Sequence, residues 1–244
     1  MLFMPPSFRD LFPNPKPIIG MIHLAGASPR ERLERAYAEL QIYQSEGVDG
    51  AIIEDYHGSF EDLVRVLSDS RFAKLELVIG INYLASPFDS QALASVSRHA
   101  RFVQYDDIQT LDEEESVKYD LRRGSYPRLA VFGGVRFKGN RPTGRPLEQD
   151  IKRAMGRCEA IVTTGSGTGI ETPLIKLQEF RALMGDFPLI VGAGVTAENV
   201  ARQLEYADGA IVGSYFKPDG NTELPVDRTR VKDLMDVVKQ LRRN

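Results

Sequence analysis

Short apolar runs alternate along the chain with segments of helical periodicity. Most of these runs are continuously apolar, as in strands that are covered on both faces. The predicted strands lie at residues 17–24, 50–56, 75–82, 101–106, 128–137, 159–165, 188–194 and 209–216. In most of the gaps between them, apolar residues recur at three- and four-residue spacing, which predicts a helix.

The clearest helical pattern covers residues 29–46. Ser28 stands before Pro29, and this pair is typical of an N-cap followed by the first helical residue. Further helices are predicted to begin at Thr172–Pro173, at Thr196 and at Pro225–Asp227. Asn199 stands three residues after Thr196, where a capping box would place Glu or Gln.

The eight strand–helix units begin about 27 residues apart, and a (β/α)8 barrel occupies about 250 residues. The rival architecture is a doubly wound open sheet, but no GxGxxG motif follows the first strand. No linker or low-complexity segment divides the chain. We therefore expect an α/β protein with one domain, a (β/α)8 TIM barrel at residues 16–244, and a Pro-rich N-terminal arm at residues 1–15.

The arm reads MLFMPPSFRDLFPNP, and its prolines would break the helical core of a secretory signal. Its apolar side chains are expected to pack on the body of the protein: Phe3, Phe8, Leu11 and Phe12. The sequence leaves open whether they plug the barrel, form a homodimer contact or bind another partner.

Composition excludes several classes of partner. A formal net charge of −3 and a pI near 5.7 give no electrostatic basis for binding nucleic acid or an anionic membrane. No segment approaches the ~18 apolar residues that a membrane helix needs. Cys158 is the single cysteine, so an intramolecular disulfide is excluded. We expect a soluble, cytoplasmic protein without membrane insertion.

Glycine-rich segments follow the last three predicted strands, where barrels commonly bind phosphate. Bare N–H groups near a helix start attract anions, and glycine lets an anion approach them. The predicted phosphate-binding residues are Gly165, Ser166, Gly192, Gly194, Gly213 and Ser214. The alternative is that these glycines serve only the tight turns between strands and helices. Because consecutive loops share the pattern, we favour a small phosphorylated ligand.

Polar side chains end the earlier strands and are candidates for catalysis. Glu54 could act as a general base, since neighbouring strand residues point to opposite faces and at most one of Glu54 and Asp55 faces the barrel mouth. His23 could transfer a proton or donate a hydrogen bond, with a structural role as the alternative. Glu54 with Asp106 and Asp107 could hold Mg²⁺, but we expect no metal and no cofactor.

Four segments resemble the BtpA/SgcQ family: KPIIGMIHL, EGVDGAIIEDY, VGAGVTAENV and ADGAIVGSYFKPDG. The resemblance covers roughly residues 16–242 and implies a barrel of the ribulose-phosphate-binding type. It also implies that His23, Glu54 and Asn82 belong to the site, with Lys138 after the fifth strand. The stretch GGVRFKGN lacks the Asp and His–Lys–His-like groups usual in the family, so this chain resembles a divergent member.

Two hypotheses on function follow. The first is a barrel that binds a sugar phosphate or nucleoside-like compound and acts as a lyase, isomerase or nucleosidase. Glu54, His23 and Asn82 would then carry catalysis. The second is a non-catalytic assembly or stability factor for a membrane complex such as photosystem I, a role the resemblance associates with some members. The sequence leaves the reaction, turnover itself and the oligomeric state open.

Overall fold

The computed structural model describes residues 5–85, 89 and 99–243. Phe3 therefore lies outside the described residues. Eight parallel strands pair in chain order and close into a barrel, with β1 pairing to β8. The strands are β1 (Ile18–Ile22), β2 (Gly50–Glu54), β3 (Val78–Asn82), β4 (Ala100–Tyr105), β5 (Ala130–Gly134), β6 (Ala160–Thr164), β7 (Leu189–Gly192) and β8 (Gly209–Val212). The predicted (β/α)8 TIM barrel is confirmed.

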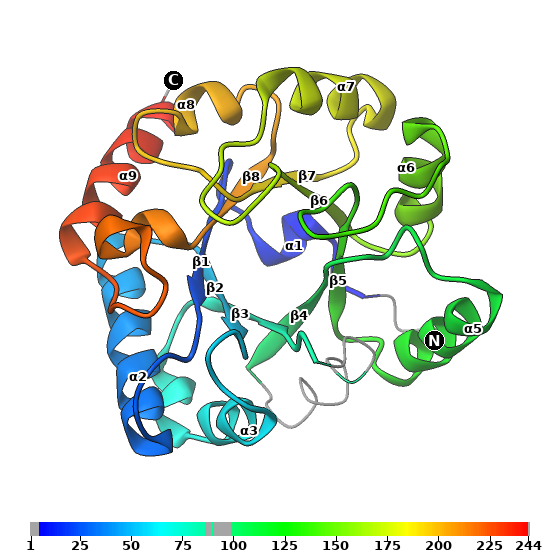
Figure 1. The fold of residues 1–244 in the computed structure, drawn as a ribbon. Coiled ribbons are helices and arrows are strands. Elements are labelled where there is room, and N and C mark those ends of the chain that lie inside the picture. The colour runs from blue at the N-terminus through cyan, green and yellow to red at the C-terminus, as the bar shows by residue number, and fades with distance from the viewer. Residues whose placement is uncertain (1–4, 86–88, 90–98, 244) are drawn as a thin grey trace.

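All the labelled α-helices except α1 surround this barrel on the outside (Figure 1). The α-helices are α1 (Phe8–Leu11), α2 (Pro29–Glu46), α3 (Phe60–Leu67), α5 (Glu113–Ser125), α6 (Leu147–Met155), α7 (Leu174–Met184), α8 (Val200–Gln203) and α9 (Arg228–Leu241). The 3₁₀ helices are η1 (Ser70–Lys74), η3 (Ser214–Phe216) and η4 (Pro218–Gly220).

The helix starts follow the sequence signals with small differences. Ser28 caps α2 as predicted, its hydroxyl accepting a hydrogen bond from the N–H of Glu31. The turn at Thr196 is present, and the Asn199 side chain accepts from the Thr196 N–H at 2.8 Å. However, α8 begins only at Val200, because residues 197–199 form a turn before it. The expected capping contact thus belongs to the turn that precedes this helix.

Side-chain alternation along the strands divides the core into two layers. Ile18 and Ile22 of β1 point outward to the helices, where they join the larger apolar cluster. Ile19 and Met21 point into the barrel and meet inward side chains of the other strands. Phe102 and Phe132 stack inside the barrel with ring centroids 4.3 Å apart. The barrel interior is therefore a packed core, and open space remains only toward its ends.

The arm closes one end of this core. Phe8, Leu11 and Phe12 are 3–4% exposed and belong to the same interior cluster as Phe132. The rings of Phe8 and Phe12 lie 5.8 and 6.3 Å from that of Phe132. Figure 1 shows α1 within the ring of strands. Of the three roles left open by the sequence, these side chains serve as a plug at the end where the strands begin.

Candidate functional site

The other end of the barrel carries polar side chains and glycines at the next inward-facing positions. Except for Asn82, which follows Gly80, each of these residues lies two positions after an apolar side chain of the interior, so it points the same way. These residues are His23, Glu54, Asn82, Gln104, Thr164, Gly192 and Gly213. All except Asn82 line a cavity at the mouth, and Asn82 is buried directly beside Glu54. Fold and alternation thus bring the three predicted catalytic residues to one place.

Two carboxyl groups share one amide in this cavity. The Asn82 Nδ2 group donates to Glu54 Oε2 at 2.9 Å and to Asp106 Oδ1 at 3.1 Å. Gln104 Nε2 donates to the same Asp106 oxygen at 2.6 Å. Asp55, in contrast, accepts a hydrogen bond from the backbone N–H of Leu84 at 2.7 Å and does not line the cavity. Glu54 is therefore the carboxylate of its pair that faces the mouth.

Burial changes the proton affinity of both carboxyl groups. Glu54 is 7% exposed, and its removal from water, reinforced by the charge of Asp106, raises its pKa to about 8. Burial likewise raises the pKa of Asp106, against the lowering effect of hydrogen bonds from Gln104 and Asn82. At neutral pH Glu54 is mainly protonated, so the pair carries fewer than two negative charges. It can then both donate and accept a proton.

His23 lies in the same cavity, but its pKa is lowered, whereas burial raises the pKa of Glu54 and Asp106. Burial, followed by the charge of Lys217, lowers its pKa to about 3, so its imidazole is neutral at physiological pH. Its Nδ1 atom is buried and has no hydrogen-bond partner among the described residues. Lys217 is itself fully buried and pairs with Glu39 at 2.8 Å. His23 is thus suited to accept or donate a hydrogen bond rather than to carry a charge.

The loops after β6, β7 and β8 form the opposite wall, here called the anion wall. It consists of Thr168, Gly169, Gly194 and Ser214, which line the cavity and also an adjoining groove. The groove continues past Thr196 to Arg230 of α9. Lys138 lies at the cavity edge, and its ammonium group donates to Thr168 Oγ1 at 2.9 Å. The hydroxyl groups of Thr168 and Ser214 and the two cations suit an anion, and Asp219 is the carboxylate that lines the same groove.

The structure divides the six predicted phosphate-binding residues. Gly192, Gly194, Gly213 and Ser214 line the cavity. Gly165 and Ser166 stand outside this lining, and their loop contributes Thr168 and Gly169 instead. Gly165 has a packing reason to be glycine, since a Cβ there would lie 2.5 Å from the carbonyl oxygen of Ile170.

Packing also accounts for Gly194 and Gly213. Gly194 has φ +64°, and a Cβ at this position would lie 2.2 Å from the backbone nitrogen of Glu171. A Cβ on Gly213 would lie 3.2 Å from His23 Cε1, so the absence of a side chain at Gly213 leaves room for this imidazole. The glycines therefore serve close packing of the loops. Because they carry no side chains, they also leave the cavity at the mouth open to a ligand.

Two site residues were missed as catalytic candidates by the sequence. Asp106 was considered only as a metal ligand, and Gln104 was not singled out. The signal that could have found them is alternation: Gln104 and Asp106 stand two and four positions after Phe102, which points into the barrel core. Among the described residues, no group of three or more His, Cys, Asp or Glu side chains is placed to hold a metal ion.

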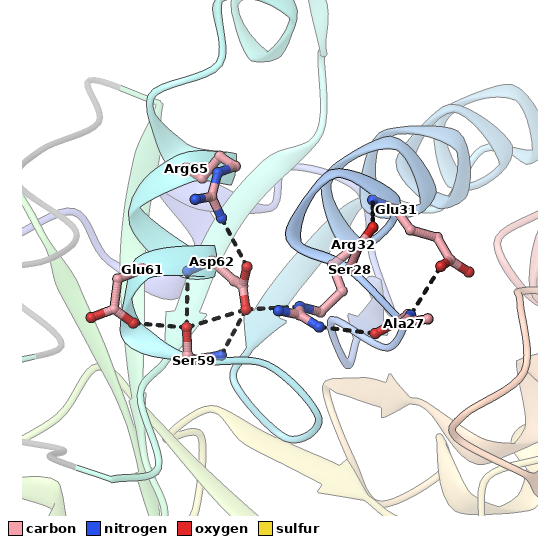
Figure 2. Close-up of polar contacts among 9 residues, drawn as sticks. Ala27, Ser28, Glu31, Arg32, Ser59, Glu61, Asp62 and Arg65 are labelled. Atoms are coloured by element: carbon pink, nitrogen blue, oxygen red, sulfur yellow. Dashed lines mark hydrogen bonds and ion pairs between the residues drawn. The ribbon is translucent and has the colours of Figure 1, made fainter.

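The loops on the β1–β2 side are fixed by a buried carboxylate at the start of α3. Asp62 accepts from Arg32 Nε of α2 at 2.8 Å and from Arg65 at 3.0 Å (Figure 2). It also accepts from the backbone N–H of Ser59, which caps α3 in return. Asp62 is 2% exposed, so the carboxylate at the centre of this network is buried, and it ties the loop after β2 to α2.

Within the part of the chain that the structure describes, no helix combines the length and apolar character needed to cross a membrane. This agrees with the absence of a long apolar run in the sequence.

Comparison with known proteins adds the family. The chain is 28% identical to an uncharacterized protein of Pyrococcus abyssi, over 93% of this chain and 97% of that protein. It is 25% identical to the photosystem I biogenesis protein BtpA of Synechocystis sp., over 94% of this chain and 90% of that protein. Phosphoribosylanthranilate isomerase of Thermus thermophilus shares the fold, with a TM-score of 0.64 at 13% identity, over 92% of this chain and 99% of that chain. A family model described as the BtpA family matches residues 14–240, and the chain therefore belongs to the BtpA family.

Proposed function

We propose that this protein is an enzyme that binds a small phosphorylated metabolite at the barrel mouth and moves a proton on it through Glu54 and Asp106. The observation that carries the proposal is the pair of buried carboxyl groups held by the single amide of Asn82. Burying two acids side by side is costly unless the site uses them. A purely structural role would be served as well by apolar side chains.

The raised pKa values assign the proton roles. Glu54, with a pKa of about 8, enters the reaction mainly protonated and acts as the general acid. Asp106 accepts two hydrogen bonds on Oδ1, which favour its ionised form, and acts as the base. This reverses the role expected for Glu54 from sequence, where it was taken as the base. An acid and a base on one side of the mouth suit isomerisation, lyase chemistry or glycosidic cleavage.

The anion wall would hold the phosphate away from the carboxyl groups. Ser214, Thr168 and the backbone at Gly194 line it, and Lys138 and Arg230 supply positive charge at its edges. Holding a remote phosphate fixes the reacting end by proximity. His23, neutral and buried, would orient the substrate or stabilise developing charge with Asn82. The name of the Thermus isomerase, whose substrate is a phosphoribosyl compound, supports the same choice of ligand class.

The assembly role stays an alternative hypothesis, supported by the name of the Synechocystis relative. It requires an exposed apolar surface for a partner. The arm was the candidate for this surface, but its Phe8, Leu11 and Phe12 are buried in the barrel. A partner would therefore have to bind elsewhere on the molecule.

Calorimetric titration with ribose 5-phosphate and other sugar phosphates tests the binding step. Ser214→Asp adds a negative charge to the anion wall and should weaken binding at least tenfold by charge repulsion. Ser125→Asp adds the same charge at the end of α5, at the opposite end of the barrel, and should leave binding unchanged. If no sugar phosphate binds, or Ser214→Asp binds as the wild type does, the phosphate site is wrong.

Turnover is tested with the same ligands by proton and phosphorus NMR. A ligand that is converted by the wild type should be bound with similar affinity by Glu54→Gln but converted roughly 10²–10⁴-fold more slowly. Conversion at the wild-type rate in both Glu54→Gln and Asp106→Asn would exclude these carboxyl groups from catalysis.

A further inference from the structure

The cavity rim beside β2 and β3 carries two exposed apolar side chains. Tyr56 is 45% exposed and Leu84 is 37% exposed, and both line the cavity that contains Glu54. Large apolar side chains exposed in a cavity indicate a surface that a ligand covers, because covering them removes apolar area from water. The four residues of the anion wall are small or carry hydroxyl groups, and the apolar side chains beside them that are not buried are Tyr215, which is partly exposed, and Ile170, which lines the adjoining groove and not the cavity.

The Tyr56 ring is held in place by neighbouring rings. It meets the imidazole of His57 edge to face, with centroids 4.8 Å apart, and that of His23 at 5.6 Å. His57 is itself fixed, since its backbone N–H donates to the His23 carbonyl at 3.0 Å. Its Nε2 atom lies 2.9 Å from Thr222 Oγ1. Tyr56 is therefore a positioned aromatic surface rather than a freely rotating one.

The loop that carries Tyr56 is anchored on both sides. Before it, Asp55 accepts from the backbone N–H of Leu84 at 2.7 Å, which joins the loops after β2 and β3. After it, the backbone N–H of Ser59 donates to Asp62, and Asp62 accepts from Arg32 of α2 in the network of Figure 2. A surface that is ordered before a ligand arrives costs less to order on binding. This arrangement favours recognition by Tyr56.

The order of the strands places Tyr56 and Leu84 across the mouth from the part of the anion wall that follows β6 and β7. In the closed order β1 to β8, β2 and β3 lie three or four strand positions from β6 and β7, which carry Thr168 and Gly194, whereas β8 with Ser214 lies two positions from β2. A ligand bound at both sides therefore spans the mouth. Its middle part lies over the cavity that Glu54 and Asp106 line.

We propose that the substrate is a phosphate monoester whose other end carries a planar aromatic ring, and that this ring stacks on Tyr56. The inference rests on the proposed function for the phosphate end and extends it to the opposite end of the ligand. A ring is favoured over an aliphatic group because the surface offered is itself aromatic, and stacked rings gain beyond their buried area. Stacking of a base on an aromatic side chain strengthens binding roughly tenfold or more.

Ribose 5-phosphate and the four ribonucleoside 5′-monophosphates form a matched set for calorimetric titration, since they differ by the ring. We expect at least one nucleotide to bind roughly tenfold more tightly than ribose 5-phosphate. Tyr56→Ala should remove this gain and leave the affinity for ribose 5-phosphate unchanged, whereas Tyr56→Phe should retain the gain.

Phe60→Ala is the matched control, because Phe60 is also an exposed aromatic residue, at 43%, but stands outside the cavity lining. It should retain the gain from the ring. Equal affinity for ribose 5-phosphate and all four nucleotides, or a gain that persists in Tyr56→Ala, would overturn the aromatic site alone. Failure of every phosphorylated ligand to bind would overturn the proposed function as well.

Discussion

Glu54 and Asn82 occupy the last paired positions of β2 and β3, and the Asn82 amide donates to the Glu54 carboxyl group at 2.9 Å. Strand register therefore sets the geometry of this contact. The same amide reaches Asp106, which follows β4. Three successive strands thus contribute one side chain each to a single buried hydrogen-bonded group.

The first prediction concerns Glu54 and alkaline pH. An unfolded glutamate titrates near ~4.3, whereas the folded Glu54 titrates at about 8. Between these values the folded protein retains a proton that the unfolded chain has lost, so stability falls as pH rises toward 8. Urea unfolding from pH 5 to 9 should show Glu54→Gln gaining stability over the wild type across this window, by up to about 1.4 kcal/mol per pH unit.

Glu148→Gln is the control for this series. Its hydrogen bond with Lys152 lowers the pKa of Glu148, so the variant should differ from the wild type by a constant amount above pH 5. Parallel stability curves for the wild type and Glu54→Gln would show that Glu54 ionises like an ordinary carboxylate.

The second prediction concerns His23 and acid. Unfolded histidine takes up a proton near ~6.5, whereas burial keeps the folded imidazole neutral to about pH 3. The contribution of His23 to the free energy of unfolding is therefore fully present above pH 6.5. Below pH 6.5 it falls by up to about 1.4 kcal/mol per pH unit. His23→Asn should lose less stability between pH 6.5 and 4.5. In the wild type, the imidazole signals of His23 should not move in NMR spectra over this range, and a midpoint near 6.5 would contradict the assignment.

The third prediction tests the packing reason for Gly194. Gly194→Ala places a Cβ against the backbone of Glu171 at a left-handed φ, and we expect a loss of roughly 2 kcal/mol or more. Gly139→Ala is the matched control, since Gly139 has φ +78° but no atom lies within 4 Å of the added Cβ. It should cost about 1 kcal/mol from backbone strain alone. If urea unfolding showed the same loss of unfolding free energy for both variants, the backbone at Glu171 would have moved aside for the added Cβ without cost.

The fourth prediction concerns the arm. Phe12→Ala removes a ring that is 4% exposed and contacts Phe102 and Phe132, and should cost about 3–5 kcal/mol. Leu121→Ala, at a side chain that is 68% exposed, should change stability by less than about 0.5 kcal/mol. A small effect of Phe12→Ala would mean that the plug is dispensable for the barrel. Chemical denaturation measures both variants.

The barrel was predictable because its strands are continuous apolar runs at regular spacing, and that signal is local. The inward orientation of Glu54 was also predictable, since alternation along one strand decides it. The link between Glu54 and Asp106 was not, because it depends on where Asp106 lies after β4 and on the amide of Asn82, which donates to both. In the same way, the reason for Gly194 lies in Glu171, a residue on another loop. No pattern within either segment reports this contact.

The plug also has a consequence for the order of folding. Phe8 and Phe12 are synthesised before every strand, yet their partner Phe132 lies more than a hundred residues later. During vectorial synthesis these two rings can meet each other, but Phe12 lacks Phe102 until the fourth strand has emerged, and both rings lack Phe132 until the fifth has emerged. We therefore infer that the end of the core where the strands begin is completed late. Its contacts join residues far apart in the sequence, so the packing of the rest of the barrel must offset the entropy lost on closing that long loop.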